Sequence, residues 1–223
     1  MADEPGAGGA RAGDQLWYAL GRRQEYEGEG RTNLLRVAAI ALFYLVELAN
    51  HHGLSLGAFP MPRVRDRPFH LAVTALAVAW TMVGLAVHLC LRRQVFPAAL
   101  KYASTGCDLL LLTCVLTVAD GPRSPLVTAY FLIIALATVR LSLPLVRFAT
   151  LGSVSGYLVL LGYARWYAVR DIHVPRYHEA VVLLALSLTG ITSGQAVRGV
   201  RAIAGSFGEG FTRTGGKQRE RPE

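Results

Sequence analysis

The stretch HLAVTALAVAWTMVGLAVHLCL, residues 70–91, contains no Lys, Arg, Asp or Glu. A helix needs about 20 apolar residues to cross the roughly 30 Å of hydrocarbon in a bilayer. Five further stretches of similar character occur along the chain. The six candidate spans are Leu34–His51, His70–Leu91, Ala98–Ala119, Pro125–Leu141, Leu145–Ala164 and Glu179–Val197. The sequence therefore predicts an all-α integral membrane bundle of six transmembrane helices.

The composition of the chain agrees with this prediction. Of the 223 residues, 52% are hydrophobic and only 17% are charged, whereas a soluble domain carries about 25% charged residues. Because so few charges cannot build a water-exposed surface, much of the outer surface is expected to face lipid. Residues 1–31 are rich in glycine and charge and lack the apolar region of a secretory signal peptide. We expect them to form a partly disordered cytoplasmic segment, with a short amphipathic helix over Asp14–Tyr26.

Basic residues predict the orientation. In a six-span arrangement, sixteen of the 23 Lys and Arg residues fall on the side that holds both termini, and seven fall on the other side. The positive-inside rule then places both termini in the cytoplasm. The transmembrane domain would cover 32–200, followed by a basic cytoplasmic tail, 201–223, that is mostly disordered. Apolar residues recur every three or four positions after Val197, which predicts that the sixth helix runs on for several turns.

The chain carries no motif of a soluble enzyme. P-loop, GxGxxG, GxSxG and HExxH patterns are all absent from the sequence, so we expect a non-catalytic protein. The net charge of +8 is explained by the arginines between the spans, and no nucleic acid partner is expected. The expected partners are the lipid bilayer, a cytoplasmic or membrane signalling protein, and a second copy of the chain.

Asp108 lies near the middle of the third span, where an ionisable side chain is costly and marks function by default. At that depth the carboxyl is either protonated or paired, and a hydrogen bond to a neighbouring helix is favoured over a proton relay. The basic residues Arg36, Lys101 and Arg140 lie near the inner ends of spans. Their side chains are expected to extend to the lipid headgroups.

A second group of polar residues gathers at the outer ends of three spans. The spacing i, i+3, i+4 places the first three on one face of the first span, and the others open the second and sixth spans. The predicted ligand-binding residues are Glu47, Asn50, His51, His70, His178 and Glu179. If the sixth helix also reaches the first, a Glu–His contact would form a pocket for a small ligand, a proton or a divalent metal of unknown identity. The competing hypothesis is a Glu–His contact that only fixes helix packing.

Two GxxxG patterns occur in the last two spans, Gly152 with Gly156 and Gly190 with Gly194. Small residues at this spacing let helix backbones approach closely in lipid. Packing between the fifth and sixth spans within one chain is favoured over a dimer interface.

Several stretches resemble the six-span, membrane-embedded N-terminal region of bacterial adenylate/guanylate cyclases and sensor histidine kinases. They are LFYLVELANHHG (42–53), LKYASTGCD (100–108), DGPRSPL (120–126), YFLII (130–134) and VPRYH (174–178). The resemblance covers about 33–200. It implies an input module in the bacterial cytoplasmic (inner) membrane that passes a signal along its last helix. No cyclase, kinase, PAS or GAF domain follows residue 200, so we expect an orphan sensor, a truncated paralogue or a subunit that acts on a separate partner.

Two other functional classes stay open. A small transporter or proton-coupled membrane protein would use Asp108 as its central ionisable group. A haem- or metal-binding membrane subunit would use His51 or His52 together with His70 or His178. No cofactor is assigned.

Overall fold

The computed structural model describes residues 7–52, 67–93, 98–167, 172 and 174–218, and all regular structure in them is helical. The described elements, in chain order, are α1 (Ala7–His52), α2 (Arg67–Arg92), α3 (Ala98–Val118), the short 3-10 helices η1 (Gly121–Arg123) and η2 (Pro125–Thr128), α4 (Ala129–Val139), α5 (Leu143–Trp166) and α6 (Arg176–Gln218). The predicted all-α class is confirmed for this part of the chain.

Five helices are long and apolar enough to cross a membrane. The five segments are Gly28–Ala49, Phe69–Arg92, Ala99–Val118, Leu143–Trp166 and Arg176–Ile203. The fourth of the six predicted spans is shorter, because η2 and α4 together make an apolar helical segment only over Pro125–Val139. The helices indicate a multi-pass membrane protein.

The outer surface of the bundle is apolar on its long helices. Leu34 on α1 is 70% exposed and Leu151 on α5 is 69% exposed, and Leu71, Leu110 and Leu184 are similarly exposed on α2, α3 and α6. A soluble monomer rarely exposes large contiguous apolar patches. Side chains of this kind on five helices are suited to contact with lipid tails.

Prolines mark the helix boundaries. Pro125 opens η2, Pro144 is the second residue of α5, and Pro175 precedes α6. A proline at the start of a helix loses no hydrogen bond, because the first backbone N–H groups have no partner within the helix. Between boundaries, 7–52 and 176–218 contain no proline.

The two proline-free segments form the longest helices, α1 with 46 residues and α6 with 43. The sequence predicted a partly disordered segment with a short amphipathic helix at 1–31 and a mostly disordered tail at 201–223; the structure has helical backbone from Ala7 and as far as Gln218. The helix past Val197 agrees with the predicted continuation. Glycine costs only about 1 kcal/mol in a helix interior, so the scattered glycines do not end either helix.

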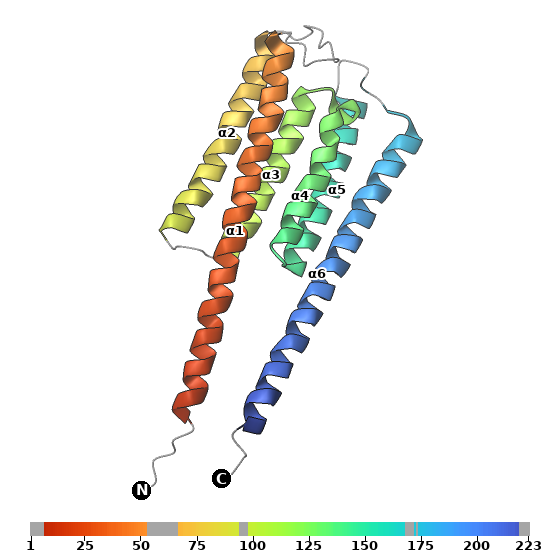
Figure 1. Cartoon of the computed structure of the whole chain (residues 1–223). Coiled ribbons are helices and arrows are strands. Elements are labelled where there is room, and N and C mark those ends of the chain that lie inside the picture. The colour runs from red at the N-terminus through yellow and green to blue at the C-terminus, as the bar shows by residue number, and fades with distance from the viewer. Residues whose placement is uncertain (1–6, 53–66, 94–97, 168–171, 173, 219–223) are drawn as a thin grey trace.

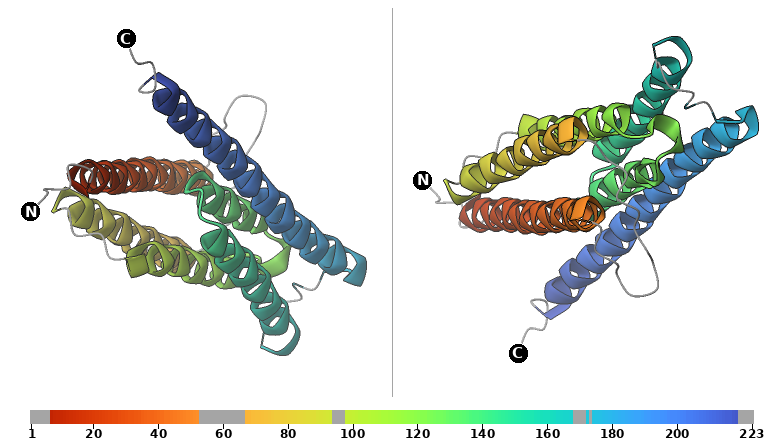
Figure 2. Two further views of the ribbon diagram at one scale, coloured as in Figure 1. Left: turned by 90° about the horizontal axis from the view of Figure 1, so that it is seen from below. Right: turned by 90° about the horizontal axis from the view of Figure 1, so that it is seen from above.

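Figure 1 shows α1 and α6 projecting well past the other helices at one end of the bundle, where α1 begins and α6 ends. We call this the inner end and the opposite one the outer end. The helix α4 is central and packs against α1, α3, α5 and α6. Further packed pairs are α1 with α2, α2 with α3, α3 with α5, and α5 with α6, an arrangement that can be followed along the bundle axis in Figure 2.

The hydrophobic core lies where α3, α4 and α5 meet. Its largest fully buried side chains include Leu116, Tyr130, Ile134 and Tyr157. The Tyr130 hydroxyl is 2.8 Å from Thr113 Oγ1, which satisfies a polar group inside the core. This core holds α4 in place.

The glycines of the GxxxG patterns lie at close helix contacts. A Cβ added to Gly190 on α6 would come within 2.3 Å of Thr150 on α5. The predicted packing of the fifth span on the sixth is therefore confirmed at this position. A Cβ at Gly152 would instead meet Leu109 on α3 at 2.4 Å, so the α5 pattern also serves a second interface.

Candidate functional site

One face of α1 carries a stripe of buried polar side chains. Glu29, Thr32, Asn33 and Arg36 are spaced i, i+3, i+4 and i+7, which places them on one side of the helix. All four are buried, Glu29 and Arg36 with only 2% of their surface exposed. In a bundle this apolar, such a stripe requires polar partners on a neighbouring helix.

Helix α3 supplies a matching stripe with the same spacing. Lys101, Ser104, Thr105 and Asp108 also stand at i, i+3, i+4 and i+7, and the last three are buried. The order of charge is reversed between the stripes, since the acidic residue comes first on α1 and last on α3. Arginines on α1 and at the end of α4 complete the pairing.

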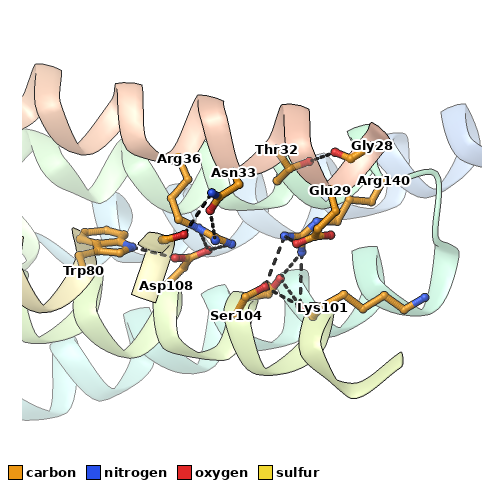
Figure 3. Close-up of polar contacts among 12 residues, drawn as sticks. Gly28, Glu29, Thr32, Asn33, Arg36, Trp80, Lys101, Ser104, Asp108 and Arg140 are labelled. Carbon is orange, nitrogen blue, oxygen red and sulfur yellow. Dashed lines mark hydrogen bonds and ion pairs between the residues drawn. The ribbon is translucent and has the colours of Figure 1, made fainter. Parts of the chain in front are cut away.

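Asp108 is the centre of the first cluster (Figure 3). Arg36 donates through Nε to Asp108 Oδ2 at 2.9 Å, and its Nη2 lies at the same distance from that oxygen. Trp80 Nε1 on α2 donates to the other carboxylate oxygen at 2.7 Å. Asn33 accepts from Arg36 Nη1 at 3.1 Å and donates to the Gly84 carbonyl on α2 at 3.1 Å. Both oxygens of Asp108 are therefore satisfied.

Arg140, which follows α4, is the centre of the second cluster. It donates to Glu29 Oε1 at 2.5 Å and to Thr105 Oγ1 at 2.8 Å. Weaker contacts reach the Lys101 carbonyl at 3.3 Å and Ser104 Oγ at 3.4 Å. Figure 3 shows this cluster beside the Asp108 cluster, between the same two helices.

We call the two clusters together the inner polar network. Its members are Glu29, Asn33, Arg36, Trp80, Thr105, Asp108 and Arg140. Two carboxylates balance two guanidinium groups, so the network is neutral as a whole. It ties α1, α2, α3 and the end of α4 together without leaving an excess charge in the bundle.

The structure changes the sequence-based interpretation of the basic residues. Asp108 is paired, with partners on two neighbouring helices. Arg36 and Arg140 were expected to extend to the headgroups, and this is wrong: their side chains are only 2% and 5% exposed and form ion pairs. The pairing releases them from the need to reach water, because each guanidinium finds a carboxylate inside the bundle. Glu29 and Trp80 were not singled out, although the polar spacing on α1 was a readable signal for Glu29.

A cavity of about 410 Å³ lies toward the outer end, between α1, α2, α3 and the segment that leads into α4. We call it the outer cavity. It is lined by Ile40, Phe43, Tyr44, Val46, Glu47, Phe69, Val73, Ala77, Trp80, Leu112, Val115, Ala119, Asp120, Ser124, Pro125, Leu126 and Ala129. Trp80 belongs both to the cavity wall and to the inner polar network, so the two regions share a side chain.

The predicted outer residues occupy different places in the bundle. Glu47 lines the outer cavity, and its buried Oε1 has no hydrogen-bond partner among the described residues. His70 is half-buried in the first turn of α2, which packs on α1. The side chains of Asn50 and His51 lie outside the described part of the structure.

The two remaining predicted residues begin α6. His178 is exposed and Glu179 is half-buried. The outer end of α6 lies far from that of α1 in both Figure 1 and Figure 2, and α6 packs instead on α4 and α5. The structure thus brings the helices of Glu47 and His70 together and places the α6 pair on the other side of the bundle.

Within the described residues, no group of three or more His, Cys, Asp or Glu side chains could hold a metal ion. No protein-family model, curated protein or solved structure matches this chain. Three features of the structure bear on function: the outer cavity, the inner polar network and the long helices.

Proposed function

We propose that this protein is a non-catalytic sensory input module of membrane signal transduction, which acts on a separate partner through its long terminal helices. One observation carries the proposal: α1 and α6 continue without interruption from the bundle past its inner end (Figure 1). The apolar part of α6 ends at Ile203 and the helix ends at Gln218. At 1.5 Å per residue this extension is about 22 Å long, enough to present a helical surface to a partner.

The inner polar network is connected to α6 at this end. Arg140, which bonds Glu29 on α1, is followed by Leu141, whose carbonyl accepts a hydrogen bond from Arg201 Nη2 on α6 at 2.6 Å. Leu141 has a φ of 49°, a left-handed conformation that costs a residue with a side chain free energy. A shift of Arg140 would therefore move the Leu141 carbonyl and alter its hydrogen bond with Arg201, near the start of the α6 extension.

Trp80 connects the same network to the outer cavity. A molecule that displaces its ring from the cavity side would alter the hydrogen bond to Asp108, and with it the Arg36 ion pair. Ion-pair networks in packed helices have discrete arrangements and suit switching between two states. The proposed signal runs from the cavity through Trp80, the network and Arg140 to α6.

We further propose six crossings with both termini in the cytoplasm, in the inner membrane of a bacterium. The excess of basic residues at the inner side supports this orientation. So does the position of the start of α1 and the end of α6 at one end of the bundle. The short fourth segment fits a crossing because α4 is surrounded by four other helices and needs little contact with lipid. The resemblance to cyclase and histidine kinase input regions supports both the membrane and the sensory assignment.

Reporter fusions test the orientation. A reporter joined after Val197 should be cytoplasmic, and one inserted within 54–66 should be on the opposite side. A C-terminal reporter on the outer side would reject the six-crossing arrangement.

A helix breaker tests the output. Val200 is exposed in the interior of α6, so Val200→Pro should interrupt the helix at a cost of about 3 kcal/mol. Photo-crosslinkers placed between 204 and 218 would identify the partner, whose activity is then measured with each variant. We expect Val200→Pro to insert normally and to lose regulation of the partner, whereas Val200→Ala keeps it. Unchanged partner activity after removal of 199–223 would reject the proposed function.

A further inference from the structure

The outer cavity has the size and lining of a small-molecule site. Pockets for such ligands measure about 300–1,000 Å³ and are mainly apolar with a few placed polar groups. The cavity, at about 410 Å³, lies near the lower end of that range. A phospholipid with two acyl chains is much larger, so the volume favours a compact ligand with few carbon atoms.

Among the residues that line the cavity, Glu47 has a buried oxygen, Oε1, without a hydrogen-bond partner in the described structure. The hydroxyl of Tyr44, which also lines the cavity, is 3.3 Å from Thr74 Oγ1. The Glu47 side chain is half-buried, and an oxygen that is taken out of water without a partner costs free energy. A ligand that brings a charged N–H donor would remove this cost.

The remaining lining favours a positive charge. Glu47 and Asp120 both line the cavity, and the described lining includes no Lys, Arg or His. Phe43, Phe69 and Trp80 add aromatic rings, whose faces attract cations and whose area suits an apolar body. An anion would meet the Glu47 carboxylate and no basic group of the described lining, and a neutral apolar molecule would leave Glu47 Oε1 without a partner.

We propose that the outer cavity binds a small lipophilic amine, with its ammonium group on Glu47 and its hydrocarbon body against the aromatic wall that ends at Trp80. The amine would be the stimulus of the proposed sensory function, and only this role as a stimulus rests on that function. Binding itself can be measured without the partner. The experiment therefore separates the two ideas.

The test compares two probes of the same shape, 4-phenylbutylamine and 4-phenylbutanol, by titration calorimetry on the purified full chain in neutral detergent. We expect the amine to bind at least tenfold more tightly than the alcohol. Glu47→Gln should abolish this difference, because the amide keeps the shape and removes the charge. The matched control is Glu179→Gln, a half-buried carboxylate outside the cavity lining, which should leave the amine affinity unchanged.

A second variant covers the case in which Glu47→Gln does not fold. Ala77 lines the cavity, so Ala77→Leu should narrow it and weaken amine binding at least tenfold. Equal affinity for amine and alcohol in the unmodified chain would overturn the proposal, as would amine binding that survives both substitutions. Amine binding that depends on Glu47, combined with a partner indifferent to Val200→Pro, would keep the inference and reject the proposed function.

Discussion

Two carboxylates in this bundle, the buried one of Asp108 and the half-buried one of Glu47, have opposite surroundings. Asp108 in the inner polar network is bonded at both oxygens by Arg36 and Trp80. Glu47 in the outer cavity has one buried oxygen without a partner among the described residues. In an apolar bundle a satisfied charge holds helices together, whereas an unsatisfied one is available to a ligand. The difference separates the part of the molecule that fixes the helix arrangement from the part that can respond to a ligand.

The inner network is better understood as a device for specificity than as a source of stability. Desolvation of two charges offsets most of their attraction, and replacing a buried pair by apolar residues is often neutral or stabilising. Removal of only one charge of the pair is destabilising, because it leaves the other charge buried without a partner. The acidic and basic residues of the α1 and α3 stripes stand in opposite order, so they favour one register of the two helices.

The largest expected effect comes from Arg36→Leu. It leaves Asp108 without its charged partner and should destabilise the protein by about 3–5 kcal/mol. For a chain of this size the midpoint of thermal unfolding in detergent should fall by roughly 6–20 °C. The double variant Arg36→Leu, Asp108→Leu should recover most of the loss. A double variant as unstable as the single one would show that the network contributes more than paired charges.

Gly190→Ala changes packing without removing a charge, so its effect on stability can be compared with that of Arg36→Leu. The added Cβ would lie 2.3 Å from Thr150, and forced overpacking costs about 1–3 kcal/mol. Gly199→Ala is the control, because nothing lies within 4 Å of a Cβ at that position. Thermal unfolding should distinguish the two variants. Equal midpoints would mean that α5 and α6 separate easily at this contact.

Trp80→Phe removes the side chain that the two regions share. Loss of the 2.7 Å hydrogen bond to Asp108 should cost about 0.6–2 kcal/mol, the range measured for hydrogen bonds between membrane helices. The ring still fills the cavity wall, so the apolar lining is kept. If signals pass through Trp80, this variant should weaken regulation of the partner more than its stability loss explains. Normal regulation in a stable Trp80→Phe protein would argue against this route.

Glu47→Gln should have the smallest effect on unfolding, about 0.5 kcal/mol or less. The substitution breaks no hydrogen bond of Oε1 within the described structure, and the side chain that it changes is only half-buried. The unfolding midpoint without ligand should therefore match that of the unmodified protein. A loss comparable to that of Arg36→Leu would show that Glu47 is a structural partner, and the contrast between the two carboxylates would fail.

Single residues of the two regions could be predicted from the sequence, but most of their partners could not. Asp108 was marked by its depth in an apolar span, and Glu47 by its place near the end of another. Arg36 and Arg140 were misjudged, because the same arginine near a helix end either extends to the headgroups or turns inward, depending on what faces it. The predicted meeting of Glu47 with residues that open α6 assumed that α6 lies beside α1, whereas the structure packs α6 on α4 and α5.

By itself, the sequence determined the helical class, five of the six predicted long apolar spans and the helix boundaries at proline. These properties are local, since each depends on the chemistry of neighbouring residues and on the thickness of a bilayer. Only the tertiary structure decided that α4 stands at the centre, that the stripe of Glu29 and Arg36 meets Arg140 and Asp108, and that Glu47 lines a cavity. Those outcomes depend on which helices pack together, and in lipid this is set by shape and polar pairing between distant segments, not by hydrophobicity along the chain.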